Sequence, residues 1–177
     1  MKVAIITNSY PQGSETFIVR QATQLDAFVY CSSINENQKS NFNVDYSKVF
    51  SLDSDKKNFL SLFDKLYNKI AGRPFSYWST RSKNKFNYFL RKHKIDVVIA
   101  QFGPNGIKAL ETCKKLSIPL VVQFLGYDAS SLVRNEWYLR KINEVMSYAS
   151  AGIVLYEGME QPFITSASIN QKFSVIS

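Results

Sequence analysis

The sequence predicts an α/β protein with a Rossmann-like, doubly wound and mostly parallel sheet that carries helices on both faces. The stronger apolar runs are short and rich in Val and Ile, which is typical of parallel strands covered on both faces. Helical patterns separate these runs, so that strand and helix alternate as in βαβ units. A chain of 177 residues is long enough for one domain with a core and short for two. We therefore expect residues 1–177 to form a single domain.

Each apolar run predicts a strand. In chain order these are Val3–Thr7, Ala27–Cys31, a weaker run at Lys48–Leu52, Asp96–Ala100, Pro119–Phe124 and Gly152–Leu155. The polar and irregular residues 32–45 predict a mobile loop. A further strand begins at Phe173. Because a domain rarely stops on a new strand, we expect another segment to follow it in a longer protein.

Apolar residues recur at helical spacing between the strands. The helices predicted in this way are Glu15–Leu25, Lys57–Ile70, Lys83–Lys92, Pro104–Leu116 and Arg134–Ala149. Ser14 is placed to cap the first of them, and Pro104 suits the first position of the fourth. A shorter helix is expected near Glu160, since Pro162 is tolerated only in a first turn.

The composition is that of a globular protein, with 45% apolar and 20% charged residues. No apolar stretch approaches the roughly 18 residues of a membrane-spanning helix, and residues 1–8 do not resemble a signal peptide, so we expect a cytoplasmic protein. Cys31 and Cys113 are then expected to be buried thiols. No His, Cys and carboxylate cluster has the spacing of metal ligands, and no nucleophile has a base near it in sequence. Metal sites and covalent catalysis are not expected.

The charge is unevenly distributed. Between residues 56 and 94 there are eleven Lys or Arg and one acid, so this basic block carries +10 while the rest of the chain sums to −2. The block also contains many aromatic residues. It is either a solvated helical surface or a face that docks on an anionic membrane; nucleic-acid binding is disfavoured, because no binding motif accompanies the charges. The membrane-facing candidates are Lys65, Lys69, Arg73, Trp78, Arg81, Lys83 and Lys85.

Polar turns, most of them with glycine, follow several of the predicted strands, at the edge where open α/β sheets bind ligands. After the first strand come Ser9-Tyr10-Pro11 and Ser14-Glu15-Thr16-Phe17-Ile18. Later turns read Gln-Phe-Gly-Pro-Asn-Gly at 101–106, Phe-Leu-Gly-Tyr-Asp-Ala-Ser at 124–130 and Tyr-Glu-Gly-Met at 156–159. In this order and spacing they resemble the N-terminal domain of a family 4 glycosyltransferase with the two-domain GT-B architecture, of the type that builds bacterial polysaccharide or lipopolysaccharide.

The resemblance implies that this domain binds the acceptor, a glycan or a lipid-linked sugar, at the inner face of the cytoplasmic membrane. A C-terminal domain, absent from this chain, would bind the nucleotide sugar, and transfer would retain the anomeric configuration without metal or other cofactor. Relatives usually carry a histidine directly before Gly-Tyr-Asp, where this chain has Leu125. Leucine neither hydrogen-bonds a sugar nor transfers a proton, so no catalytic residue is assigned and the isolated chain is expected to be inactive. The alternative is a non-catalytic module that binds glycan or protein and derives from a truncated glycosyltransferase.

Ten residues are candidates for substrate binding. They are Gly13, Ser14, Gln101, Gly103, Asn105, Gly106, Gly126, Tyr127, Asp128 and Glu157. Gly13 and Ser14 would present amides to a phosphate, or form an ordinary helix cap. Gln101 and Asn105 would bind acceptor hydroxyls.

Several of these candidates have structural alternatives. Gly103 and Gly106 would let the acceptor approach closely, or would cap the helix and pack on the sheet. Asp128 would bind a sugar hydroxyl or cap its own turn. Tyr127 is expected to pack rather than to take part in chemistry. Glu157 would either contact a ligand or be a surface charge. His93, the only histidine, is expected to be solvated among like charges.

Overall fold

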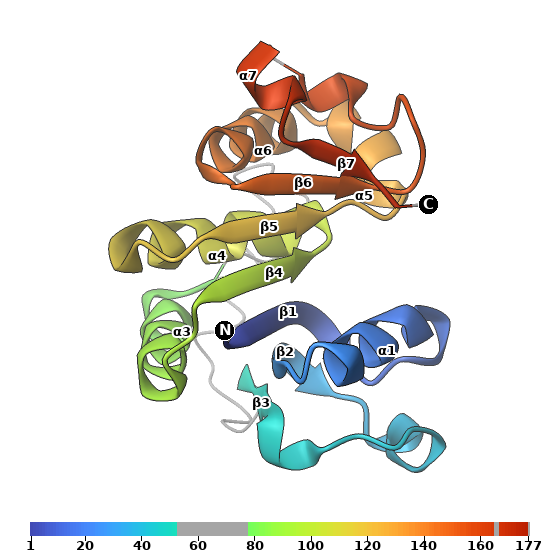
Figure 1. The fold of residues 1–177 in the computed structure, drawn as a ribbon, viewed down its shortest axis with the longest axis vertical. Coiled ribbons are helices and arrows are strands. Elements are labelled where there is room, and N and C mark those ends of the chain that lie inside the picture. Colours follow the sequence, from blue (N-terminus) through green and yellow to red (C-terminus); the bar gives the residue numbers. More distant parts are fainter. Residues whose placement is uncertain (53–77, 165–166, 177) are drawn as a thin grey trace.

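The computed structural model describes residues 1–52, 78–164 and 167–176. Seven parallel strands form one sheet in the order β3-β2-β1-β4-β5-β6-β7 (Figure 1). Their bounds are β1 Val3–Tyr10, β2 Phe28–Ile34, β3 Val49–Ser51, β4 Val97–Gln101, β5 Leu120–Gln123, β6 Ala151–Val154 and β7 Phe173–Val175. The strand order reverses direction between β1 and β4, so their carboxyl ends flank the crevice where such sheets bind ligands. The predicted fold class is confirmed.

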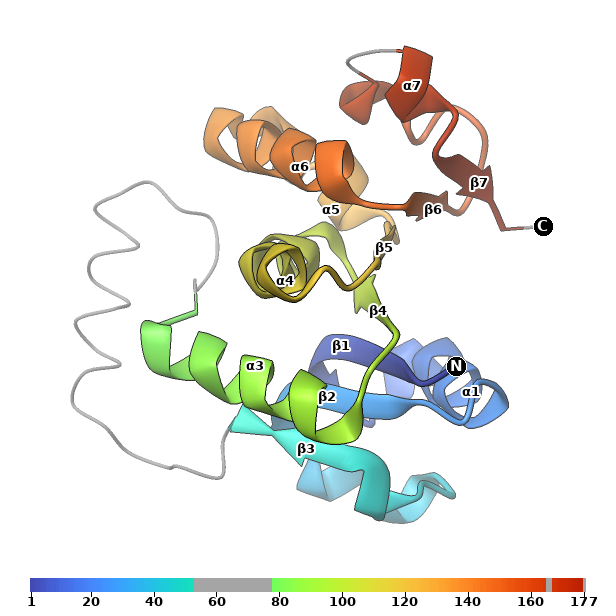
Figure 2. The same cartoon turned by 60° about the vertical axis from the view of Figure 1, so that its left-hand side comes forward.

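Helices lie on both faces of the sheet (Figure 2). The α-helices are α1 Thr16–Gln24, α3 Thr80–His93, α4 Gly103–Leu116, α5 Tyr127–Ser130, α6 Glu136–Tyr148 and α7 Ala167–Asn170. Short 3₁₀ helices are η1 Gly13–Glu15, η2 Glu36–Asn41, η3 Tyr46–Lys48, η5 Leu132–Arg134 and η6 Gln161–Phe163. Helix α1 covers β1 and β2 on one face, while α3, α4 and α6 cover the other.

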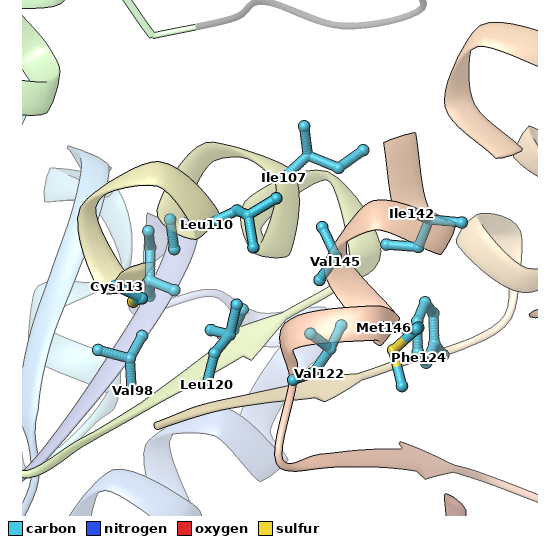
Figure 3. Packing of buried hydrophobic residues seen from close by; sticks show 14 of the residues in the cluster. Val98, Ile107, Leu110, Cys113, Leu120, Val122, Phe124, Ile142, Val145 and Met146 are labelled. Carbon is cyan, nitrogen blue, oxygen red and sulfur yellow. The ribbon is translucent and has the colours of Figure 1, made fainter. Parts of the chain in front are cut away.

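The sheet separates two hydrophobic clusters. In the larger one, Val98, Leu120 and Val122 of the sheet meet the inner faces of α4 and α6, as Figure 3 shows. The smaller one joins the opposite side of β1 and β2 to α1. Both cysteines are buried thiols, one in each cluster, as predicted.

Several boundaries differ from the prediction. Strands β1 and β2 continue as a parallel pair to Tyr10 and Ile34, so the predicted loop begins as strand, because backbone pairing compensates for the polar side chains there. Ser14 does not cap α1: the helix begins at Thr16, and the Ser14 hydroxyl instead accepts from Gln12 Nε2 at 3.2 Å. The short helix expected near Glu160 is a 3₁₀ turn. The predicted helix at 57–70 lies outside the described residues.

Helix α3 turns its phenylalanine rings inward, whereas its tyrosine is exposed. Trp78, just before it, is 8% exposed and packs against Tyr30 and Phe86, with ring centroids 5.8 and 5.1 Å away. The prediction of a membrane-facing Trp78 is therefore wrong, since burying the large ring in the core outweighs its use at a surface. His93 is half-buried rather than fully solvated: its ring lies 4.6 Å from that of Phe50, and burial lowers its pKa, helped by nearby Lys92 and Lys2.

The described cations of the basic block lie along α3. Arg81 is exposed, Lys83 forms an ion pair with Glu111 of α4, and Lys85 is half-buried. The other three membrane-facing candidates, Lys65, Lys69 and Arg73, lie outside the described residues. Among the residues that the structure describes, no helix is both long and apolar enough to span a bilayer.

Candidate functional site

The two central Gly-bearing turns are joined by the carboxylate of Asp128. Its Oδ2 accepts from the Gly103 amide at 2.8 Å, and its Oδ1 accepts from the Leu125 amide at 3.0 Å. Gly103 is the first residue of α4, so this buried negative charge also lies at the positive end of that helix. Asp128 thus connects the turn after β4 to the turn after β5.

Asp128 is 2% exposed. Burial raises the pKa of its carboxyl, while the hydrogen bonds from the backbone amides act in the opposite direction. Of the two roles expected for Asp128, the structure shows the turn-capping one. Contact between this carboxylate and a sugar hydroxyl stays a prediction.

A buried lysine lies at the point where the strand order reverses. Lys108 of α4 is 7% exposed, and its Nζ donates to Asn8 Oδ1 at 2.9 Å and to Asn105 Oδ1 at 3.1 Å. Asn8 belongs to β1 and is exposed, whereas Asn105 in the first turn of α4 is buried. Both acceptors are neutral amides, and burial lowers the pKa of Lys108 to about 8.

Lys108 is not among the site residues predicted from the sequence. A usable signal was present, because the residue is the only charge in the apolar stretch Gly106-Ile107-Lys108-Ala109-Leu110, which directly follows a predicted edge turn. A charged side chain within the buried face of a helix is expected only with a special partner or role.

Glutamines lie on the other side of the same edge. Gln101 Nε2 donates to Oε1 of Gln21 on α1 at 2.5 Å, and Gln21 Nε2 approaches Gln123 Oε1 at 3.5 Å. Gln101 and Gln123 are neighbours in the β4–β5 register. Gln101 is fully buried, and its Oε1 has no hydrogen-bond partner among the described residues. The same is true of Thr7 Oγ1 on the adjacent strand β1.

The backbone between β4 and α4 is strained. Phe102 has φ 66° and ψ 142°, a region that residues other than glycine rarely adopt. Its amide donates to the Gln123 carbonyl at 2.8 Å, and its carbonyl accepts from the Asn105 amide at 3.0 Å. These two bonds hold the conformation, which places the start of α4 against the sheet. Such strain is common at functional edges.

The two glycines of this turn allow close packing. A Cβ on Gly103 would lie 2.1 Å from the Tyr138 hydroxyl, and one on Gly106 would lie 3.1 Å from Val122 Cγ2. Both glycines are buried, so the packing role holds for them in this structure. Asn105 is likewise buried, and its Nδ2 donates to the Gln101 carbonyl at 2.8 Å.

The remaining candidates are accessible. Tyr127 is 68% exposed, so its favoured interpretation as a packing residue is wrong: the turn after β5 directs the ring away from the core. Gly126 beside it has φ 123° and open space around its Cα. Gly13, Ser14 and Glu157 are exposed in the turns after β1 and β6.

The structure therefore divides the ten predicted residues into two groups. Those at the centre of the edge are buried and form its support: Gln101, Gly103, Asn105, Gly106 and Asp128. Those in the outer turns form a rim, in which Gly126 is half-buried and the other four are exposed: Gly13, Ser14, Tyr127 and Glu157. The Gly13 turn lies beside Gln38 of η2, and no described hydrogen bond connects it to the Gly126 turn.

No histidine is available at this edge. Leu125 is half-buried and contributes only its backbone amide, while His93 ends α3 at the opposite edge of the sheet, where β4 begins. Within the described ranges, no three His, Cys, Asp or Glu side chains gather closely enough to hold a metal ion.

No family model and no curated protein sequence matches the chain. HepE from Anabaena, solved with UDP and glucose, matches 99% of the chain with a TM-score of 0.66 at 18% identity. Sucrose-phosphate synthase from Thermosynechococcus elongatus matches 99% of the chain with a TM-score of 0.61 at 13% identity. UDP-N-acetylglucosamine 2-epimerase from Rickettsia bellii matches 93% of the chain with a TM-score of 0.55 at 15% identity.

The match covers 44%, 47% and 41% of these three proteins, so the chain spans less than half of their length. The chain has the fold of one half of the GT-B architecture, as the resemblance implied.

Proposed function

We propose that this chain is the acceptor-binding half of a retaining glycosyltransferase of family 4. The complete enzyme would transfer a sugar from a nucleotide sugar to a glycan or lipid-linked acceptor during synthesis of cell-surface polysaccharide. A second domain would supply the donor site, and the isolated half would turn over nothing. No metal or other cofactor is required by this proposal.

The observation that carries the proposal is the carboxyl edge of the sheet. The Asp128 carboxylate fixes two turns to each other, and the turns after the neighbouring strands β5 and β6 carry the exposed side chains of Tyr127 and Glu157 at the same edge. A rigid support with accessible polar and aromatic side chains is suited to sugars, which present hydroxyls and apolar ring faces at once. HepE, sucrose-phosphate synthase and a UDP-glucosyltransferase from Polygonum tinctorium share the fold.

A non-catalytic binding module is the second candidate. Leu125 favours it, because a side chain without donor or acceptor stands where the resembled enzymes carry histidine. Activity in the complete protein separates the two candidates. Turnover of a nucleotide sugar supports the enzyme, and its absence together with retained acceptor binding supports the module.

Binding by the isolated chain tests the assignment of halves. We expect an oligosaccharide or prenyl-linked sugar to bind weakly and to shift the amide resonances of the rim in an NMR titration. Tyr127→Ala should weaken this binding severalfold, because stacking on an exposed ring is lost. Tyr88→Ala is the matched control, since Tyr88 is 65% exposed on α3 and lies outside the rim. Micromolar binding of UDP-glucose by this chain alone would contradict a donor site in the missing half.

We further propose that the basic block brings the domain to the inner face of the cytoplasmic membrane, where a lipid-linked acceptor resides. Exposed Arg81 on α3, together with Lys92 and Lys94 near its end, supports this proposal. Trp78 takes no part, because it belongs to the core.

A further inference from the structure

The Lys108 ammonium is a buried positive charge without a counterion among the described residues. Its two acceptors, the side-chain oxygens of Asn8 and Asn105, are neutral. The carboxylate of Asp128 at the same edge uses its two oxygens for backbone amides. Removing an ammonium from water without an opposite charge is costly, and a hydrophobic residue would fill the same space at less expense. The charge is therefore expected to serve a ligand.

The position of the ammonium fits a ligand site. Side chains on a helix lean towards its N-terminus, so Lys108 reaches back from the second turn of α4 to the level of Asn105 in the first. Asn8 follows the last β1 residues paired with β4 and is exposed. The ammonium thus contacts a solvent-exposed residue, Asn8, at the point where the strand order reverses. Open α/β sheets bind ligands at this point.

The hydrogen-bonding capacity of the group is not exhausted. A lysine ammonium has three hydrogens, and the two amide oxygens are its only acceptors within the described part of the chain. Exposed Asn8 can add a second donor through its Nδ2 while its Oδ1 accepts from Lys108. Two adjacent donors, one of them charged, match an oxyanion.

We propose that Lys108 and Asn8 bind a phosphoryl group at the junction of β1 and β4. The third ammonium hydrogen and the Asn8 amide would each donate to a phosphoryl oxygen, and the anion would neutralise the buried charge. Which substrate carries this group rests on the proposed function: it is either the diphosphate of the nucleotide sugar or the diphosphate of a lipid-linked acceptor. Binding of a simple phosphoryl anion does not depend on that function.

An NMR titration with inorganic pyrophosphate tests the proposal. We expect saturable shifts of the Asn8 and Asn105 side-chain amide resonances in the wild-type chain. Lys108→Met should weaken binding by about tenfold or more, since a charge-assisted hydrogen bond is lost. Lys115→Met, which removes an exposed lysine from the end of the same helix, should leave the affinity unchanged. The dispersion of the amide spectrum reports whether each variant is folded.

A second variant keeps the lysine and supplies the missing counterion. Asn8→Asp has nearly the same shape and places a carboxylate against the ammonium, so it should compete with pyrophosphate and abolish binding while raising the melting temperature. Unchanged affinity in Lys108→Met or Asn8→Asp would overturn the proposal, as would the absence of saturable shifts in the wild-type chain.

Two further ligands identify the source of the phosphoryl group. UDP binding more tightly than pyrophosphate, at an affinity weaker than micromolar, points to the donor, and geranyl diphosphate binding more tightly points to a lipid-linked acceptor. In both cases Lys108→Met should remove most of the affinity. If acceptor sugars fail to bind but pyrophosphate still requires Lys108, the phosphoryl site stands and the proposed function fails.

Discussion

At the scale of single residues, Lys108 and Asp128 carry the opposite charges of the carboxyl edge without contacting each other. The Asp128 carboxylate accepts hydrogen bonds from two backbone amides. Lys108 has only neutral partners. This asymmetry predicts opposite effects when each charge is removed.

Replacing Lys108 with Met should stabilise the unliganded protein. The pKa of Lys108 falls from 10.5 to about 8 on folding, which corresponds to roughly 3 kcal/mol of desolvation cost at neutral pH. Part of this gain is offset because Asn105 loses a donor. Lys108→Met should therefore raise the free energy of unfolding at pH 7 by about 1–2 kcal/mol, measured by urea denaturation.

The pH dependence has a definite sign. Below pH 8 the lysine is charged in both the folded and the unfolded chain, so the cost is complete. Between pH 8 and 10.5 the folded chain releases this proton first, and the wild type gains stability relative to Lys108→Met. Lys115→Met should show no such window. A Lys108→Met variant that is less stable than wild type at pH 7 would show that the ammonium is a net stabilising donor.

Replacing Asp128 with Asn should destabilise the protein by about 2 kcal/mol. One carboxamide position becomes an Nδ2 donor that faces a backbone N–H, so one of the Gly103 and Leu125 amides is left without an acceptor. Urea denaturation at pH 7 measures the change. Asp26→Asn is the control, because Asp26 is exposed and pairs only with Lys48, and it should change stability by less than about 0.5 kcal/mol. If both variants were equally stable, the proposal that the Asp128 carboxylate stabilises the two turns would be contradicted.

At the scale of elements, the start of α4 is fitted against α6. Gly103 leaves space for the hydroxyl of Tyr138, whose side chain is fully buried. Gly103→Ala would place a methyl group 2.1 Å from that oxygen, so we expect a loss of about 1–3 kcal/mol in the free energy of unfolding. Adding Tyr138→Phe should recover part of this loss, and denaturation of the two single variants and the double variant measures their coupling. Strict additivity would refute the steric explanation.

The strands and long helices were predictable because their signals are local. Runs such as Asp96–Ala100 contain the β-branched residues of a covered strand, and α4 follows from its apolar spacing and Pro104. The extensions of β1 and β2 were not predictable, since pairing between Tyr10 and Ile34 depends on two strands far apart in sequence. The inward rotation of Trp78 likewise depends on Tyr30, a tertiary contact.

At the scale of the whole molecule, the place of the site was predictable but its chemistry was only partly so. Turns after parallel strands meet at one edge by topology alone, which is why the motifs lie at one edge of the sheet. Burial decides which of their side chains support the edge and which are accessible to a ligand. Burial in turn depends on the packing between α1, α4 and the sheet. Gln101 and Lys108 show this, because their environments come from Gln21 and Asn8 on other elements.

The uneven charge of the molecule predicts salt-sensitive binding to anionic vesicles. The basic block carries a charge of +10, whereas the whole chain carries +8. The described cations of the block lie along α3. Co-sedimentation with phosphatidylglycerol-containing vesicles at low salt should retain the protein, whereas neutral vesicles or high salt should not.

A matched pair of charge reversals separates this local surface from net charge. Arg81→Glu and Arg20→Glu each change the charge by −2, but Arg81 begins α3, while Arg20 is an exposed residue of α1, which covers the other face of the sheet. If the basic block docks on the membrane, Arg81→Glu should weaken vesicle binding by about tenfold or more, because each basic residue near an anionic surface contributes about 1 kcal/mol. Arg20→Glu should have a much smaller effect. Equal losses would show that net charge alone attracts the protein, and the membrane-docking role of α3 would then fall.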